Sequence, residues 1–243
     1  MEFCYTLGKI TNADMGVAVR LARIATAFIV TAALLLPVRV CLAASAQDNL
    51  QNRATRKPYS PSRIEKGLES PQREQWQQPD RVVAALGLQP GDVVADVGAG
   101  SGYFSFRLAK TVGSGGKVYA VDIQDEMLAY IRAKMQKTGI TNIVPVKSTP
   151  IDPMLPPGCC NSILLVNTYH ELGDPVALMK NLRKALKPGG IIAIVNWNES
   201  VTRKKLYVPM DLLVEQMKLA GFRPSKSHDF LERQYFLVFS QLN

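Results

Sequence analysis

The sequence predicts an α/β protein whose doubly wound, mostly parallel β-sheet is covered by helices on both faces. Between residues 93 and 240, short and uniformly apolar segments alternate with amphipathic segments of helical length. This alternation is typical of strands that helices bury on both faces. A glycine-rich turn also follows the first apolar segment, as expected where a buried strand turns sharply into the next helix.

The first part of the 243-residue chain is expected to lie outside this domain. Arginines precede an apolar run over residues 24–38, and residues 44–46 supply an A-x-A cleavage pattern. Residues 1–46 are therefore predicted to be a secretory signal peptide, with an uncleaved N-terminal anchor as the alternative. Arg39 ends the run before the roughly 20 apolar residues that a membrane span needs. We expect an exported, periplasmic protein or a membrane-anchored one rather than a cytoplasmic one.

The charge and the cysteine content limit the partners and metals that we expect the chain to bind. Of the net charge of +9, two units come from residues 1–46, which hold four basic and two acidic side chains. The remaining positive charge is scattered along the chain, except at Arg203-Lys204-Lys205. We interpret this triplet as part of a solvated loop, and the alternative is that it binds an anionic partner.

Beyond the leader the cysteines are Cys159 and Cys160, and neighbouring cysteines bridge only with strain. We interpret the two cysteines as small side chains at the start of a strand and predict no metal site. The alternative is that the two thiols together bind a soft metal.

The predicted domain covers residues 79–243. Residues 47–78 are polar and contain several prolines, so we expect a linker and an irregular lead-in there. Pro79 suits the first turn of a helix, and Gly87 suits its end.

The remaining elements follow from the apolar periodicity. Strands are expected over residues 93–97, 117–121, 143–147, 162–166, 191–195 and 235–239. Helices are expected over residues 103–111, 125–137, 175–187 and 209–220. Asp174 and Pro175 supply an N-cap and a proline at the first helical position. No helix follows the last strand, so we expect it to insert antiparallel.

The turn after the first strand predicts a site for a nucleotide-like ligand. Asp96 is followed by Gly98-Ala99-Gly100-Ser101-Gly102. Glycine lets the ligand approach the backbone and permits positive φ, while the following helix points free N–H groups at the ligand. The dinucleotide fingerprint would need glycine at position 103, where this chain has Tyr103. Asp122 ends the next strand, where a carboxylate can accept hydrogen bonds from ribose, although that spacing also suits NAD.

Together these features resemble the class I methyltransferases that use S-adenosylmethionine (SAM). D-V-G-A-G-S-G at residues 96–102 resembles their first motif, and L-K-P-G-G at residues 186–190 resembles their helix-to-strand turn. The resemblance covers about residues 79–240. It implies a Rossmann-like, seven-stranded sheet with an antiparallel C-terminal strand, and SAM as the cofactor.

The resemblance also implies roles for individual residues. The expected cofactor-binding residues are Asp96, Gly98, Ala99, Gly100, Gly102, Asp122, Ile123, Thr149 and Asn167. Asp96 would orient the amino group of SAM, and Asp122 would hold the ribose. Ile123 would contact the adenine, with plain core packing as the alternative. Many relatives carry an acidic residue after the third strand, where this chain offers Thr149 or Asp152.

The segment after the fourth strand, residues 167–171, faces the methyl group in this fold. Asn167, Tyr169 and His170 are therefore the expected catalytic residues. His170 could act as a general base, and the alternative is a structural histidine bonded to a loop carbonyl. The segment lacks the paired prolines of the N-P-P-Y motif that acts on nucleic-acid bases, so we expect a small-molecule acceptor and no nucleic acid.

Two further points stay open at the level of sequence. Residues 68–79 resemble the lead-in of a group of bacterial methyltransferases that often carry export signals. In related folds such a segment covers the cofactor or substrate cleft, and the alternative is that Trp76 simply packs on the domain surface. The alternatives to an enzyme of this family are a non-catalytic SAM- or nucleoside-binding protein of the same fold and a nicotinamide-dependent oxidoreductase.

Overall fold

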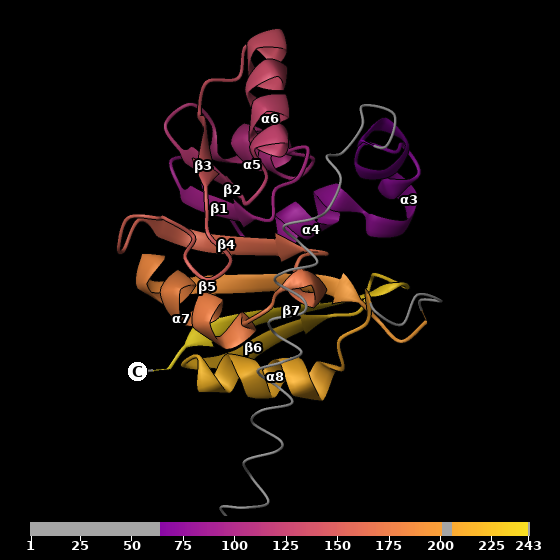
Figure 1. Cartoon of the computed structure of the whole chain (residues 1–243), viewed down its shortest axis with the longest axis vertical. Helices are drawn as coiled ribbons and strands as arrows, with labels where there is room; N and C mark the ends of the chain where they lie inside the picture. The colour runs from indigo at the N-terminus through magenta and orange to yellow at the C-terminus, as the bar shows by residue number, and fades with distance from the viewer. Residues whose placement is uncertain (1–63, 201–205, 243) are drawn as a thin grey trace, which may run out of the picture. The chain divides into compact units, whose positions relative to one another are not determined.

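The computed structural model describes residues 64–200 and 206–242. The predicted leader, most of the linker and the triplet at residues 203–205 therefore lie outside the described residues. Within the described ranges the chain forms a seven-stranded sheet in the order β3-β2-β1-β4-β5-β7-β6 (Figure 1). Strands β1 to β5 are parallel, and β7 is antiparallel to both β5 and β6. The predicted fold class is confirmed.

The strands are β1 (Val93–Val97), β2 (Lys117–Asp122), β3 (Ile143–Lys147), β4 (Cys160–Val166), β5 (Leu186–Trp197), β6 (Phe222–His228) and β7 (Gln234–Gln241). The α-helices are α3 (Arg73–Gln77), α4 (Pro79–Ala85), α5 (Ser105–Val112), α6 (Asp125–Thr138), α7 (Pro175–Ala185) and α8 (Met210–Leu219). A π-helix, η1 (Ile64–Leu68), and a 3-10 helix, η2 (Tyr169–Glu171), complete the described part of the chain.

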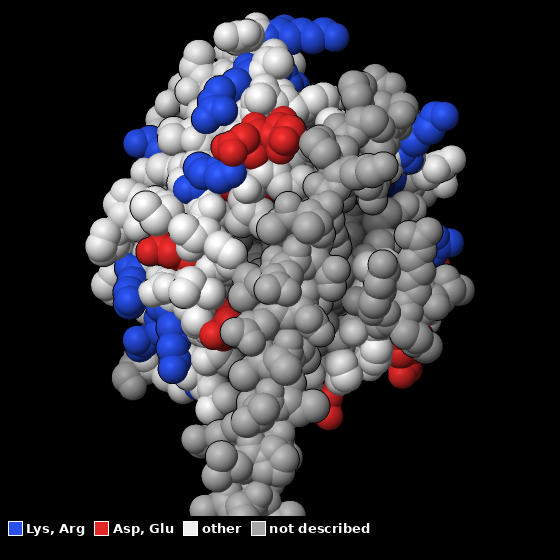
Figure 2. Space-filling view, viewed as in Figure 1, with Lys and Arg blue, Asp and Glu red and all other residues white. Residues whose placement is uncertain are grey.

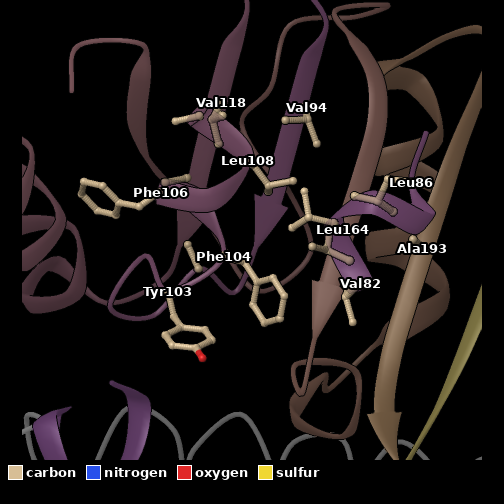
Figure 3. Close-up of a cluster of buried hydrophobic side chains, with 14 of the residues drawn as sticks. Val82, Leu86, Val94, Tyr103, Phe104, Phe106, Leu108, Val118, Leu164 and Ala193 are labelled. Atoms are coloured by element: carbon tan, nitrogen blue, oxygen red, sulfur yellow. The ribbon is translucent and has the colours of Figure 1, made fainter. Parts of the chain in front are cut away.

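Buried apolar side chains form two clusters, and successive strand residues alternate between them. In β4, Leu164 belongs to the first cluster, whereas its neighbours Ile163 and Leu165 belong to the second. The first cluster contains the apolar faces of α4 and α5, seen in Figure 3 around Leu108 and Phe104. The second contains those of α7 and α8. This alternation buries the sheet on both faces, as the uniformly apolar strands predict.

Most predicted boundaries agree with the structure. Asp174 caps α7 by accepting a hydrogen bond from the Ala177 N–H at 2.9 Å, which confirms the predicted N-cap. The helix predicted to reach residue 187 ends at Ala185 instead, because Leu186 already pairs with Cys160 in the sheet.

Strand β6 is not among the strands that the sequence predicts. It lies at the edge of the sheet, where only Phe222 is buried, and it contains Pro224 and Lys226. A proline and charged side chains are tolerated on an edge strand but remove the apolar pattern that predicts a strand. The predicted C-terminal strand is confirmed, and it inserts antiparallel between β5 and β6.

Two observations concern the surface of the described residues. No helix there is both long and apolar enough to cross a membrane. On the face seen in Figure 2, lysine and arginine side chains are scattered, and acidic side chains lie among them. This agrees with the scattered charge expected from the sequence.

Candidate functional site

The glycine-rich turn lies at the carboxyl end of β1, between β2 and β4. Strand order reverses at this point, and in open α/β sheets ligands bind at such a switch. Gly98, Gly100 and Gly102 have φ angles of 76°, 54° and 78°, in the region that favours glycine. The N–H groups of Gly98 and Ala99 both donate to the carbonyl of Val121, at 2.8 and 3.0 Å. The turn is therefore fastened to the end of β2.

Gly98 also lies directly against the segment that follows β4. A Cβ atom added there would lie 2.2 Å from Oγ1 of Thr168, so no side chain fits. At Gly100 the nearest neighbour would be a Leu68 methyl at 3.6 Å, which is ordinary contact distance. The turn is thus packed tightly against the segment after β4. Beside Gly100 there is more space, and Leu68 of the lead-in borders it.

Asp122 turns its carboxylate toward the glycine turn. Its Oδ2 accepts a hydrogen bond from the Gly100 N–H at 2.8 Å, and its Oδ1 accepts one from Gln124 N–H at 2.9 Å. The residue is 6% exposed, and burial raises the pKa of its carboxyl, while the backbone donors and Lys147 oppose that rise. The structure brings Asp122 and the turn into contact, and the ribose-binding role stays a prediction.

Asp96 lies below the turn and is 2% exposed. Its Oδ2 accepts a hydrogen bond from the Ser105 hydroxyl at 2.6 Å. Burial raises the pKa of Asp96 to about 6, and the nearby Asp122 carboxylate adds to the rise. The Ser105 hydroxyl and the Arg73 guanidinium oppose it. Two carboxyl groups therefore share the buried end of the sheet beneath the turn.

Ser101 within the turn leaves a polar atom without a partner. Its Oγ is buried and has no hydrogen-bond partner among the described residues. A buried hydroxyl of this kind needs an explanation, and a bound ligand supplies one. The orphaned hydroxyl, the open glycine beside it and the carboxylate of Asp122 fit a ligand with a ribose and a polar, amino-acid-like end.

The described part of the lead-in, from residue 64 onward, lies against the turn, and its covering of a ligand cleft stays a prediction. Leu68 contacts the open side of the turn, and its carbonyl accepts a hydrogen bond from the Arg73 guanidinium. That guanidinium lies 3.8 Å from the centre of the Tyr103 ring. Glu69 pairs with Lys134 of α6 at 2.9 Å. Burial lowers the pKa of Arg73 to about 10, so the guanidinium stays positively charged at neutral pH.

A chain of amides connects the lead-in to the segment after β4. The buried Gln77 donates to Oε1 of Gln234 at 3.2 Å, and Gln234 donates to Oδ1 of Asn167 at 2.6 Å. Asn167 adopts φ 53°, the left-handed region, directly after β4. Beside this chain, Trp76 stacks on Trp197 with ring centres 4.9 Å apart. Trp76 therefore packs on a residue of the domain, as the alternative expects, and a role in covering a cleft stays a prediction.

The predicted catalytic residues have different surroundings. Tyr169 is buried and donates its hydroxyl to Gln216 of α8 at 2.9 Å, so this hydroxyl is engaged away from the glycine turn. Nδ1 of His170 lies 2.9 Å from Oδ1 of Asn196, and Nε2 lies 3.5 Å from a Glu171 carboxylate oxygen. Nδ1 of His170 thus faces a side-chain amide in place of the loop carbonyl named in the structural alternative, and whether His170 is catalytic or structural stays a prediction.

The predicted adenine-side residues gather at the carboxyl ends of β2 and β3. Ile123, next to Asp122, is 36% exposed, which distinguishes it from a core side chain. Oγ1 of Thr149 accepts a hydrogen bond from the Asp152 N–H at 2.9 Å, so both candidates belong to one turn. Lys147 donates to the Ile123 carbonyl at 2.8 Å. These residues lie on the β2 side of the glycine turn, and residues 167–170 lie on its β4 side.

Several site residues could not be singled out from the sequence. Arg73 and Gln77 lie within the lead-in, whose pattern indicates a cover but not its contacts. Ser101 belongs to the motif, but only its burial identifies it as orphaned. Gln234 reaches the site because β7 pairs with β5 in a register that sets it opposite Trp197.

Comparison with known proteins adds independent information. The family model described as "Methyltransferase domain" matches residues 88–229. The crystal structure of a SAM dependent methyltransferase from Aquifex aeolicus is 30% identical in sequence, with a TM-score of 0.69. The match covers 75% of this chain and 98% of the Aquifex chain.

Two curated relatives match over shorter stretches. A protein-L-isoaspartate O-methyltransferase from Aeropyrum pernix is 48% identical over 66 residues, which are 27% of this chain and 25% of the relative. A ubiquinone/menaquinone biosynthesis C-methyltransferase UbiE from Shewanella sp. is 27% identical over 118 residues, which are 48% of this chain and 47% of the relative. The matched part thus spans a quarter to about half of these curated relatives.

The buried Asp96 predicts a pH-dependent stability. Its pKa of about 6 lies above the ordinary value of 3.8, so between these pH values the folded protein holds a proton that the unfolded chain has released. Rising pH through this window therefore destabilises the fold. In Asp96→Asn this titration is absent, so the free energy of unfolding of the variant minus that of the native protein should rise by on the order of 2 kcal/mol between pH 4 and 6.

Denaturant unfolding of both proteins across this pH range measures the difference. A second variant, Ser105→Ala, should extend the upper end of this window to higher pH, because it removes a hydrogen bond that stabilises the charged carboxylate. A difference between Asp96→Asn and the native protein that stays constant from pH 4 to 8 would show that Asp96 does not titrate in this way.

Proposed function

Because the chain belongs to the methyltransferase domain family and uses SAM as its cofactor, we propose that it transfers the SAM methyl group to a small-molecule acceptor. The observation that carries the proposal is the contact between the Asp122 carboxylate and the glycine turn. The acceptor would bind between the lead-in and the segments that follow β4 and β5. The curated relatives are named for different acceptors, so they support methyl transfer in general and neither acceptor in particular.

The residues around the turn fit the parts of the cofactor. Asp122 would accept hydrogen bonds from the ribose, and the exposed Ile123 would contact the adenine. At the amino-acid end, Asp96 would bind the amino group, while the Ser101 hydroxyl and the Arg73 guanidinium would meet the carboxylate. When bound, SAM supplies an electrophilic methyl group, whose carbon–sulfur electrons return to sulfur as the acceptor's lone pair forms the new bond.

The chain itself would position the acceptor and receive its proton. His170 is the proposed base for a hydroxyl or amine acceptor. With Oδ1 of Asn196 facing Nδ1, the neutral ring carries its proton on Nδ1 and leaves Nε2 able to accept one. The carboxylate of Glu171 near Nε2 would stabilise the charged ring that results.

We also propose that residues 1–46 direct export, so that the domain acts in the periplasm or at the membrane. The support is the leader pattern in the sequence. Mass spectrometry of the protein purified natively from its host measures both the mass of the chain and any bound nucleoside. We expect a chain that lacks residues 1–46, or an intact chain recovered in the membrane fraction. An intact chain in the cytoplasmic fraction would contradict export.

Substitution of Asp122 tests the cofactor site. Asp122→Ala should abolish SAM binding in isothermal titration calorimetry, because the ribose hydroxyls lose their acceptor and the Gly100 N–H loses its partner. Asp125→Ala is the matched control, since that carboxylate is exposed and pairs with Lys147. The control should bind SAM like the native protein. Native affinity in Asp122→Ala would refute the ribose assignment.

His170→Ala complements this test. It should keep the affinity for SAM, because the ring lies on the β4 side of the turn, and it should reduce methyl transfer. Transfer is measured as tritium passed from methyl-labelled SAM to a small-molecule extract of the host. An undiminished rate in His170→Ala would assign the histidine a structural role.

A further inference from the structure

The chain contains two tryptophans, and the structure stacks them on each other. Trp76 comes from α3 in the lead-in, and Trp197 is the last residue of β5. Their planes are inclined by 23°, with ring centres 4.9 Å apart, and both residues are partly exposed. A further flat ring can stack on the outer face of such a pair where that face is exposed.

This pair stands beside the acceptor side of the proposed site. Trp197 lies opposite Gln234 in the pairing of β5 with β7. Gln234 in turn bonds to Asn167, the first residue after β4, and to Gln77, the neighbour of Trp76. The indole rings and the amide chain therefore form one cluster, which we call the indole–amide cluster: Trp76, Gln77, Asn167, Trp197 and Gln234.

The polar groups of the indole–amide cluster are neutral amides. Of the charged side chains of α3, Glu74 accepts a hydrogen bond from the Tyr103 hydroxyl at 2.7 Å. Arg73 lies over the Tyr103 ring and donates to Oε1 of Gln77 at 2.8 Å, so one guanidinium borders the cluster. The members of the cluster themselves offer stacking and neutral hydrogen bonding.

The geometry of the pair also differs from that of an aromatic cage. Quaternary ammonium groups are typically bound in cages of several ring faces, although a single ring face also attracts a cation. Here the two indole planes are nearly parallel and already in contact, so they cannot surround a cation between them. A flat ring that extends the stack fits this arrangement better.

We propose that the indole–amide cluster recognises the methyl acceptor, and that the acceptor is a planar, uncharged aromatic compound whose polar substituents bond to the amides. The proposal rests on the proposed function, since it assigns the acceptor class of the same site. Stacking on the indole pair would orient the ring, and the amide of the half-buried Asn167, held by the buried Gln234, would orient its substituents toward the methyl group.

The fluorescence of the protein tests the proposal directly, because both tryptophans belong to the cluster. The full chain is first saturated with S-adenosylhomocysteine and then titrated with catechol, resorcinol and phloroglucinol. Fluorescence is excited at the red edge of tryptophan absorption, where these phenols do not absorb. We expect saturable quenching by at least one phenol. Cyclohexane-1,2-diol, which has hydroxyls but no flat ring, and choline, which is a cation, should cause none.

Substitution of Trp197 supplies the matched pair of variants. Trp197→Leu should weaken binding of the phenol roughly 2- to 10-fold in calorimetry, the range expected for one lost aromatic stack. Trp197→Phe should restore most of this affinity because it keeps an aromatic face. Both variants should bind S-adenosylhomocysteine like the native protein, which shows that they are folded.

The outcomes separate the two proposals. If the native protein fails to bind S-adenosylhomocysteine, the proposed function itself fails. If it binds S-adenosylhomocysteine but none of the three phenols, or binds cyclohexanediol or choline equally well, the acceptor class is overturned. Equal phenol affinity in Trp197→Leu and the native protein would overturn the role of the indole–amide cluster.

Discussion

The site depends on how the glycine turn is held at the carboxyl ends of three strands. Hydrogen bonds from Gly98 and Ala99 to Val121, and from Gly100 to Asp122, fasten the turn of β1 to the end of β2. The contact between Gly98 and Thr168 presses the same turn against the segment after β4. The proposed cofactor side and the proposed acceptor side are therefore adjacent, because no side chain at Gly98 separates them.

The same arrangement buries two carboxyl groups, and burial raises the free energy of their charged forms. The carboxylate of Asp122 adds to the cost of ionising the buried Asp96, and the guanidinium of Arg73 offsets part of this cost. Such groups weaken a fold unless a ligand uses them, and perturbed carboxyl groups at a switch point are typical of functional sites. The lead-in matters here, because it brings Arg73 over the turn and reaches Asn167 through the amide chain.

The parts of this structure that local chemistry controls could be predicted from the sequence. The apolar strands, the glycine turn and the cap of α7 each depend on neighbouring residues, and all are confirmed. Strand β6 was missed because an edge strand needs little apolar pattern, and α7 ends early because Leu186 joins the sheet. The Trp76–Trp197 stack and the contacts of Gln234 depend on tertiary pairing between distant segments, which no spacing in the sequence reveals. The contact of Tyr169 with α8 likewise follows from helix packing.

The central claim is that the glycine turn and Asp122 together hold the adenosyl part of SAM. A crystal structure of the protein with S-adenosylhomocysteine tests it most directly. We expect ribose hydroxyls within hydrogen-bonding distance of the Asp122 carboxylate, and the amino-acid end beside Ser101. A nucleoside bound elsewhere, with Asp122 still bonded only to backbone N–H groups, would contradict the account.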